Sequence, residues 1–258
     1  RDTIARRCAD AGKPELADCV VWHDRLPASF DGAIVGNEVL DAMPVRLFVR
    51  THRGGWLERG VVATGDGFGW SDRPAAAPLP AVLATLPDAV LAAPGYVAET
   101  HEAALGFIRT VAQMLGRGAV LLADYGFPAA EYYHPQRAEG TLIGHYRHHS
   151  HDDPFLYPGL SDLTAHVEFS GIAVAGVDAG LELLGYTSQG RFLLNAGIVE
   201  LLRELDPQQI HTYAPTVSAV QKLLSEAEMG ELFKVIGFGR GVDWLPSGFA
   251  SGDRTHTL

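Results

Sequence analysis

Residues Gly32 to Gly36 form a short apolar run between two glycines, and polar residues follow it directly. Such a run is typical of a buried strand, and the residues after it fall where the strand gives way to a loop. Open α/β sheets bind their ligands at these strand ends. The amide of Asn37 and the carboxylates of Glu38 and Asp41 would be costly to desolvate there. They therefore indicate catalysis or a cationic partner rather than simple packing.

A second strand end of the same kind follows further along the chain. Residues 104–115 carry apolar side chains at helical spacing, and glycines separate them from the apolar strand 119–123. Asp124 and Tyr125 come directly after that strand. Strand and helix patterns also alternate elsewhere, which favours a parallel or mixed sheet with helices on its faces. We therefore expect two neighbouring strands to present acidic groups at one edge of the sheet.

The chain is predicted to form one core with two insertions and a small helical subdomain. The core is expected to comprise residues 1–190 and 230–258, with insertions at 45–95 and 129–168. The helical subdomain is expected to comprise residues 191–229. Apolar residues alternate after Pro44 and a turn follows at 53–55, which predicts a β-hairpin in the first insertion. The second insertion is rich in His, Tyr, Arg and Gly, and so long a loop is typical of a lid or a binding loop. Further expected elements are helices at 1–11, 171–180, 192–205 and 217–224, and strands at 19–22, 181–186 and 232–238, the last at an edge.

Composition and charge argue against several classes of partner. With 258 residues and 47% hydrophobic content, the chain can bury the core of one large domain or two small ones. A net charge of -11 without a run of basic residues argues against nucleic acid, whereas a basic peptide or an arginine would be attracted. The apolar runs are far shorter than a membrane span. The two cysteines, Cys8 and Cys19, suit a reducing compartment, so we predict a cytoplasmic protein without membrane contact.

Histidines gather in the second insertion and suggest an alternative chemistry. The possible metal ligands are His145, His148, His149, His151, Asp152, Asp153, His166 and Glu168. A divalent metal held there would indicate a metal-dependent hydrolase. The spacing matches neither His-Glu-x-x-His nor a zinc-finger pattern, and the cysteines are remote in sequence. We therefore favour a structural or substrate-orienting role for these histidines and assign no metal.

Five blocks of the sequence resemble the MidA-like methyltransferases. They are residues 37–45, 124–127, 134–142, 162–169 and 189–192. The blocks keep the order that they have in the family and cover most of the chain, and the histidine-containing block 134–142 is highly specific. The resemblance implies an α/β fold with a Rossmann-like class I methyltransferase sheet, S-adenosylmethionine as cofactor, and methyl transfer to an arginine of a protein substrate. The family includes the mitochondrial arginine methyltransferase required for the assembly of respiratory complex I.

The same resemblance implies that part of the family's site lies outside this sequence. The glycine-rich loop after the family's first strand and the acidic residue that binds the ribose should both precede the helix at Arg1. We therefore expect a chain truncated at its N-terminus. The resemblance also points to the bacterial cytoplasm or the mitochondrial matrix as the location, and it is compatible with a homodimer.

The chemistry that the resemblance implies assigns roles to the first strand end. Methyl transfer from a sulfonium is an in-line displacement, so the protein mainly holds donor and acceptor in place and excludes water. A guanidinium acceptor needs carboxylates that pair with it, and Glu38 and Asp41 are the candidates. In methyltransferases of this class the residues after this strand face the methyl group. Asn37 is therefore a third candidate catalytic residue, and Asn37 and Glu38 are expected to bind the cofactor. Alternatively, Asp41 caps a helix from Ala42, and Glu38 forms a structural ion pair.

Other residues are candidates for binding the cofactor and the acceptor. His23 and Asp24 follow the strand that ends at Trp22, where related sheets contact the adenine; an ordinary polar turn is the alternative. The candidate substrate-binding residues are Tyr125, in the methyl-transfer pocket, and a lid made of Arg137, Tyr146, His149 and His166. Hydrogen bonds that stiffen the long loop are the alternative role for the lid residues.

Three functions therefore remain open on the sequence alone. They are an S-adenosylmethionine-dependent methyltransferase acting on a protein arginine, a metal-dependent hydrolase, and a non-catalytic assembly factor that binds another protein through a methyltransferase fold. The acidic strand ends and the family blocks favour the first.

Overall fold

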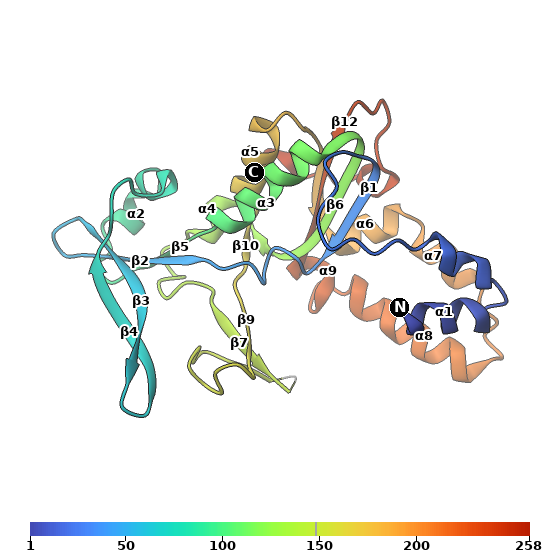
Figure 1. The fold of residues 1–258 in the computed structure, drawn as a ribbon, viewed down its shortest axis with the longest axis horizontal. Coiled ribbons are helices and arrows are strands. Elements are labelled where there is room, and N and C mark those ends of the chain that lie inside the picture. Colours follow the sequence, from blue (N-terminus) through green and yellow to red (C-terminus); the bar gives the residue numbers. More distant parts are fainter. Residues whose placement is uncertain (148) are drawn as a thin grey trace.

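The computed structural model describes residues 1–147 and 149–258, and its centre is a mixed sheet (Figure 1). The strand order is β1-β6-β12-β11, and β10 also pairs with β6. These strands are β1 (Phe30–Asn37), β6 (Leu115–Phe127), β10 (Val167–Glu168), β11 (Glu182–Ser188) and β12 (Phe233–Arg240). β1 and β6 run parallel, with Asn37 opposite Ala123, whereas β12 is antiparallel to both of its neighbours. The prediction that two polar strand ends share one sheet edge is confirmed.

Two helices pack against the central sheet, and the spacing of apolar residues in their sequences predicts both of them. α3 (Glu102–Met114) buries Ile108 and Val111, and α5 (Phe169–Asp178) buries Ile172. The helices contact each other and the sheet, whose buried residues include Leu122 and Phe238. Both helices were predicted. The buried Glu168 carboxylate caps α5 and accepts a hydrogen bond from the Gly171 N–H at the start of this helix, over 2.9 Å.

Three strand predictions are wrong. Gly32 to Gly36 were expected in a buried strand, but no residue of β1 is buried and Val35 is 74% exposed, because β1 is at the edge of the sheet and pairs only with β6. Residues 232–238 were expected at an edge, but β12 lies between β6 and β11, and seven of its eight residues are buried. Lys234 is buried there because its ammonium lies 3.4 Å from the Glu231 carboxylate. Residues 19–22 were expected as a strand, but the segment belongs to no sheet, and Val21 and Trp22 are exposed. A short apolar run specifies a strand only where a neighbouring strand takes up its backbone hydrogen bonds.

The first insertion and β5, which follows it, form a separate four-stranded antiparallel sheet, at the left of Figure 1. Its order is β4-β3-β2-β5, and the strands are β2 (Arg46–Arg50), β3 (Trp56–Thr64), β4 (Gly67–Pro74) and β5 (Val97–Thr100). The predicted hairpin is confirmed as β2 and β3, and β4 and β5 extend it on either side. The short helices η2 (Ala81–Ala84) and α2 (Asp88–Leu91) supply Leu83 and Val90 to a core with Phe48 and Tyr132.

The second insertion is more ordered than the loop that was expected. It contains α4 (Ala129–Tyr132) and a small antiparallel sheet of order β8-β7-β9. The strands are β7 (Ile143–Tyr146), β8 (His149–His151) and β9 (Asp162–Thr164). Each has only three or four residues, so its period was too short to recognise in the sequence.

The remaining helices lie at the N-terminus and after β11. They are α1 (Asp2–Asp10), η1 (Pro14–Cys19), α6 (Gln189–Asn195), α7 (Ile198–Arg203), α8 (Ile210–Leu224), α9 (Met229–Leu232), η3 (Ser247–Phe249) and η4 (Thr255–Thr257). The helix expected over 192–205 is interrupted at Gly197, and α8 begins upstream of Pro215 rather than after it. Within the described part of the chain, none of these helices has the length and apolarity needed to cross a membrane.

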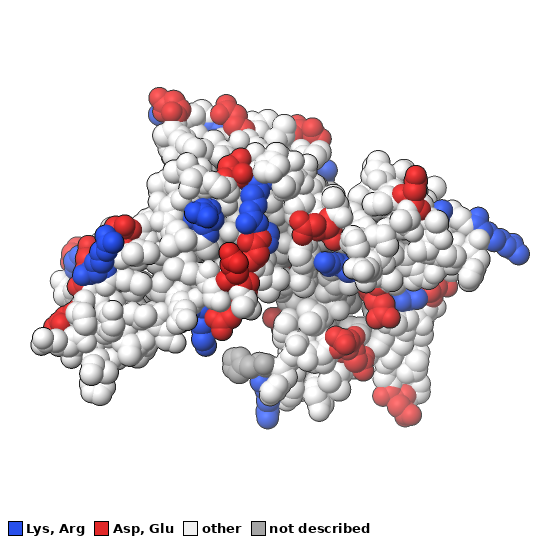
Figure 2. Space-filling view, turned by 180° about the vertical axis from the view of Figure 1, so that it is seen from behind, with Lys and Arg blue, Asp and Glu red and all other residues white. Residues whose placement is uncertain are grey.

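Charges are mixed on the face shown in Figure 2. Acidic and basic side chains stand next to one another there, and the blue groups do not merge into one large patch. The acidic groups on this face are scattered, so attraction of a cationic partner here depends on the local groups at a site.

Candidate functional site

The buried carboxylate of Asp124 joins the ends of β1 and β6. Its Oδ2 accepts hydrogen bonds from the backbone N–H groups of Val39, Leu40 and Asp41, over 3.1, 2.9 and 3.3 Å. Its Oδ1 accepts one from the Tyr125 N–H, over 2.9 Å. Burial, and then the nearby Asp41 carboxylate, raise the pKa of Asp124 to about 7, although the backbone donors act in the opposite direction. One side chain thus fixes the loop that carries the candidate catalytic acids.

Glu38 turns the chain at the end of β1. Its φ of 51° lies in the left-handed region, where a residue with a side chain costs on the order of 1 kcal/mol. The Glu38 N–H donates to the Ala123 carbonyl over 3.0 Å, so the turn stays attached to β6. The Asn37 amide donates to Glu38 Oε1 over 3.1 Å, and both side chains are exposed. Strain at a polar residue beside a cavity is typical of a functional position.

Asp41 is buried, and only one of its two carboxylate oxygens accepts a hydrogen bond. The Tyr125 hydroxyl donates to Asp41 Oδ2 over 2.6 Å, whereas Asp41 Oδ1 is buried and has no hydrogen-bond partner among the described residues. Burial, and then the bond to Asp41, raise the pKa of the Tyr125 hydroxyl, which therefore keeps its proton. Asp41 does not act as a helix cap, because no helix begins at Ala42. Within the described ranges, Glu38 makes no ion pair, so the alternative interpretation of each residue lacks support.

These groups face a cavity of about 400 Å³, which we call the acceptor cavity. It lies between the ends of β1 and β6, the small sheet of the second insertion and the start of β12. The lining residues are Glu38, Asp41, Tyr125, Ile143, His145, Ser150, Asp162, Thr164, His166, Leu232 and Phe233. Four predicted site residues therefore meet at one place, and they come from segments far apart in sequence.

His166 closes one side of the acceptor cavity as a neutral ring. The imidazole is stacked on Phe127, with ring centroids 5.4 Å apart and planes 3° apart, and it meets the Tyr125 ring edge-on at 5.1 Å. Burial, and then the positive charge of Arg137, lower the pKa of His166 to about 4. The ring is therefore uncharged near neutral pH and does not repel a cation.

Comparisons with known proteins agree with this architecture. Residues 2–187 match the family model Methyltransf_28, described as "Putative S-adenosyl-L-methionine-dependent methyltransferase". The chain belongs to this methyltransferase family. The predicted family is thereby confirmed, and S-adenosylmethionine is confirmed as the cofactor on which the family depends.

Two solved structures and several curated relatives resemble the chain. A superfamily member from Burkholderia thailandensis, bound to S-adenosyl-homocysteine, is 58% identical with a TM-score of 0.91. The alignment covers 98% of this chain and 65% of that one. A native crystal structure of a superfamily protein from the same organism is 57% identical with a TM-score of 0.88, and 67% of it is covered. The predicted α/β methyltransferase fold is confirmed as a mixed sheet accompanied by antiparallel sheets.

The curated relatives carry a more specific name. The "Protein arginine methyltransferase NDUFAF7 homolog, mitochondrial" of Caenorhabditis elegans is 31% identical over 196 residues, which are 72% of this chain and 42% of that protein. The protein of the same name in Drosophila melanogaster is 28% identical over 235 residues, 86% of this chain and 50% of that protein. This member of the methyltransferase family thus spans half or less of the length of these relatives.

The other predicted site residues lie outside the acceptor cavity of this methyltransferase family member. His23 and Asp24 are in an exposed bend. His149 is exposed in β8, and the Tyr146 ring packs on Tyr157 with centroids 4.6 Å apart. Arg137 lies over the Phe127 ring at 4.2 Å and lines a different pocket, together with Glu131, His134 and Gln136. The predicted lid is therefore only partly assembled. His145 and Ser150 are paired and line the cavity, so the next pair, Tyr146 and His149, faces the other side of β7 and β8.

The histidines do not converge on a metal site in the described part of the chain. Within residues 1–147 and 149–258, no group of three or more His, Cys, Asp or Glu side chains is placed to hold a metal ion. His145 faces the acceptor cavity, whereas His151 Nε2 lies 3.2 Å from the Ser161 hydroxyl. His148 lies outside the described residues. No contact in the described structure supports the hydrolase alternative.

Sequence reasoning missed a second buried carboxylate, Glu99, which holds the second insertion in place. Its oxygens accept hydrogen bonds from the backbone N–H groups of Thr141 and Leu142, over 2.9 and 2.8 Å, and from the Thr141 and Tyr132 hydroxyls. Gly140, with a φ of 81°, lets the chain pass close to this carboxylate. The sequence signal that could have found it is an acidic residue inside the short apolar strand 97–100. A carboxylate buried there needs several hydrogen-bond donors from neighbouring segments.

We expect a histidine beside Glu99 to make stability depend on pH. Burial lowers the pKa of His101 to about 4 from the usual 6.5, so the folded state binds its proton less readily than the unfolded state. Stability due to the neutral ring is present above about pH 6.5 and is lost as the pH falls through about 4. In His101→Phe, which keeps a ring beside Tyr132, this loss should be absent. The unfolding free energy of the variant relative to wild type should therefore change by up to about 1.4 kcal/mol per pH unit in that window.

Denaturant unfolding at several pH values measures this difference. The contributions of Asp124 and Glu168, whose pKa values burial raises to about 7 and about 6, have the opposite sign. They are present in both proteins and cancel in the comparison. A difference that stays constant between pH 4 and 7 would show that His101 does not titrate in this way.

Proposed function

We propose that this chain forms the acceptor-binding part of an S-adenosylmethionine-dependent methyltransferase that methylates an arginine of a protein substrate. The observation that carries the proposal is the unpartnered Oδ1 of Asp41 at the acceptor cavity. Buried polar atoms almost always have partners, so an oxygen held free by a fixed loop is suited to accept a hydrogen bond from a ligand. The names of the curated relatives, which are protein arginine methyltransferases, agree with a guanidinium in that place.

The residues around Asp41 suit a planar cation. Asp41 and Glu38 provide two carboxylates from one short loop, and a guanidinium can donate to both. Neutral His166 and the Tyr125 ring supply uncharged aromatic surface beside them, which is favourable for a cation. Together these groups would orient the guanidinium and concentrate its positive charge on the nitrogens that pair with the carboxylates, away from the nitrogen that receives the methyl group. Phe233 and Leu232 would exclude water from the same space.

The cofactor fits the same edge of the sheet. S-adenosylmethionine, when bound, supplies the methyl group from its sulfonium. The exposed Asn37 and Glu38, at the carboxyl end of a parallel strand, are the residues of this chain that we propose contact it. We further propose that β1, β6, β12 and β11 belong to a Rossmann-like class I sheet, since a parallel pair is followed by an antiparallel strand. A role for His23 and Asp24 at the adenine, and a link to respiratory complex assembly, stay predictions.

Methyl transfer from labelled S-adenosylmethionine tests this function. The full-length protein is incubated with methyl-tritiated cofactor and a peptide that carries one arginine, and a matched peptide carries lysine instead. We expect label on the arginine peptide alone, together with heat of cofactor binding in calorimetry. Cofactor binding without transfer to any arginine substrate would instead favour the non-catalytic assembly factor. Labelling of the lysine peptide to the same extent would contradict the arginine assignment.

A further inference from the structure

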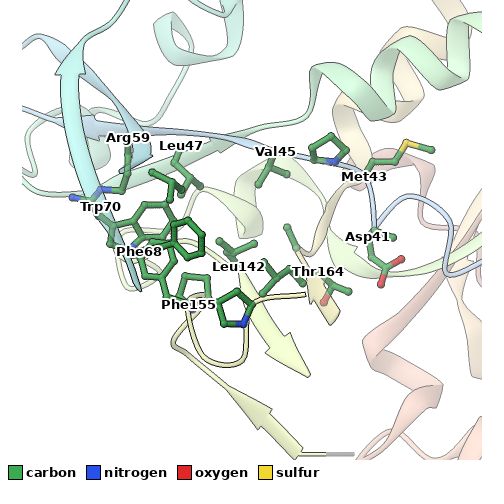
Figure 3. A pocket seen from close by; sticks show the side chains of 17 residues that line it. Asp41, Met43, Val45, Leu47, Arg59, Phe68, Trp70, Leu142, Phe155 and Thr164 are labelled. Carbon is green, nitrogen blue, oxygen red and sulfur yellow. The ribbon is translucent and has the colours of Figure 1, made fainter. Parts of the chain in front are cut away.

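A second cavity of about 480 Å³ opens beside the acceptor cavity, and Asp41 and Thr164 line both. Figure 3 shows Asp41 at one end and the aromatic side chains at the other. We call the apolar end the aromatic groove and define it by five residues: Val61, Phe68, Trp70, Leu142 and Phe155. Its size and apolar lining are those of sites that bind small ligands or single side chains.

The aromatic groove is built from elements that hold one another. The Trp70 ring meets the Phe155 ring edge-on, with ring centroids 4.8 Å apart. The Phe68 ring also lies beside the Phe155 ring, with centroids 6.5 Å apart. The Arg59 guanidinium lies 5.8 Å from the Trp70 ring, and its Nε and Nη2 donate to both oxygens of Asp72 over 2.8 and 2.9 Å. A bidentate pair of this kind fixes the orientation of the guanidinium. These contacts hold the walls of the groove to one another.

The same side chains remain open to solvent. Phe68 is 48% exposed, Val61 57% and Trp70 39%. Contiguous exposed apolar surface is uncommon on single chains and marks binding sites, and tryptophan is frequent among the side chains that dominate such contacts. An apolar partner that covers the groove is consequently favoured over water.

We propose that the aromatic groove binds a large apolar side chain of the same protein segment whose arginine enters the acceptor cavity. The proposal rests on the proposed function and adds the class of substrate: a segment with an arginine and a nearby aromatic or large aliphatic residue. Two observations select this occupant. The two cavities are neighbours that share Asp41 and Thr164 in their linings, and the lining changes from carboxylates in the acceptor cavity to aromatic rings in the groove.

The chain itself limits the spacing between the two substrate residues. One stretch of chain forms the floor of the second cavity between the acceptor cavity and β2, and its lining residues are Asp41, Ala42, Met43, Pro44, Val45 and Leu47. Six residues span at most about 20 Å when fully extended. A substrate segment lying along this floor therefore has its apolar residue within about six positions of its arginine.

Peptide binding tests the proposal independently of catalysis. The probes are two fluorescein-labelled peptides of glycine and serine, each with one arginine, and one of them has tryptophan about four positions from it. Fluorescence anisotropy with the full-length protein gives the dissociation constants. We expect the tryptophan peptide to bind about tenfold more tightly than its serine counterpart, because a large apolar side chain is removed from water.

Val61 and Val62 provide matched variants on the two faces of one strand. Val61 lines the groove and pairs with Trp70, whereas Val62 is 40% exposed and does not line it. Val61→Asp should abolish the preference for the tryptophan peptide, and Val62→Asp should keep it. Because both residues are exposed, neither change is expected to unfold the sheet. Cofactor binding should be the same in both variants.

Three results would overturn the proposal. They are equal affinity of the two peptides for wild type, equal effects of the two variants, and a wild-type dimer that Val61→Asp converts to monomers, since a second copy would then occupy the groove. Failure of the proposed function is distinguishable, because it removes methyl transfer while leaving the anisotropy preference intact.

Discussion

Asp124→Ala should lower the free energy of unfolding by about 3 kcal/mol. The substitution removes the acceptor of the N–H groups of Val39, Leu40, Asp41 and Tyr125, and those of Leu40 and Asp41 are buried. Each unpaired buried donor is costly, and the left-handed turn at Glu38 then loses the contacts that maintain it. Denaturant unfolding measures the change.

Asp31→Ala is the matched control for that substitution. Asp31 also lies on β1 and accepts a backbone N–H of β6, from Arg117 over 2.9 Å, but its side chain is exposed. We expect a change of about 0.5 kcal/mol, because water replaces the lost acceptor. If both variants unfold at the same denaturant concentration, Asp124 does not organise the strand ends.

Asp41→Asn should reduce the rate constant of methyl transfer by about 100-fold while leaving cofactor binding unchanged. The variant keeps the size of the side chain but loses the negative charge that would hold a guanidinium through the unpartnered Oδ1. The prediction is checked by single-turnover transfer to an arginine peptide, with cofactor affinity from calorimetry.

Asp162→Asn separates this role from the general charge of the acceptor cavity. Asp162 lines the same cavity, but its side chain is exposed and solvent screens its charge. A loss of less than about fivefold is expected there. Equal losses of the transfer rate constant in the two variants would indicate that Asp41 contributes only to the general negative potential of the cavity.

The strand ends could be predicted because their signals are local. A glycine-bounded apolar run places Asn37, Glu38 and Asp41 at the end of β1. The strand expected over 119–123 is longer in the structure, so Asp124 and Tyr125 lie within the last four residues of β6 rather than after it. The periodicity of α3 and α5 is local as well. These parts of the sequence were enough to predict that acidic groups share one sheet edge.

What could not be predicted depends on contacts between distant segments. The role of Asp124 requires backbone donors that lie more than 80 positions away. The sequence of β12 does not show whether the strand is central or at an edge, because its central position comes from pairing with β11 on one side and with the distant strand β6 on the other. His149 and Tyr146 were grouped with His166 by proximity in sequence, but the register of β7 with β8 takes them away from the cavity.

The central claim is that the methyl donor and the acceptor meet at the cavity lined by Glu38 and Asp41. The most direct measurement is a crystal structure of the full-length protein with S-adenosyl-homocysteine and an arginine peptide. We predict that the sulfur atom lies at the mouth of the acceptor cavity beside Glu38, with the guanidinium bound to Asp41 Oδ1. A sulfur atom that faces away from this cavity, or an arginine bound elsewhere, would contradict the account.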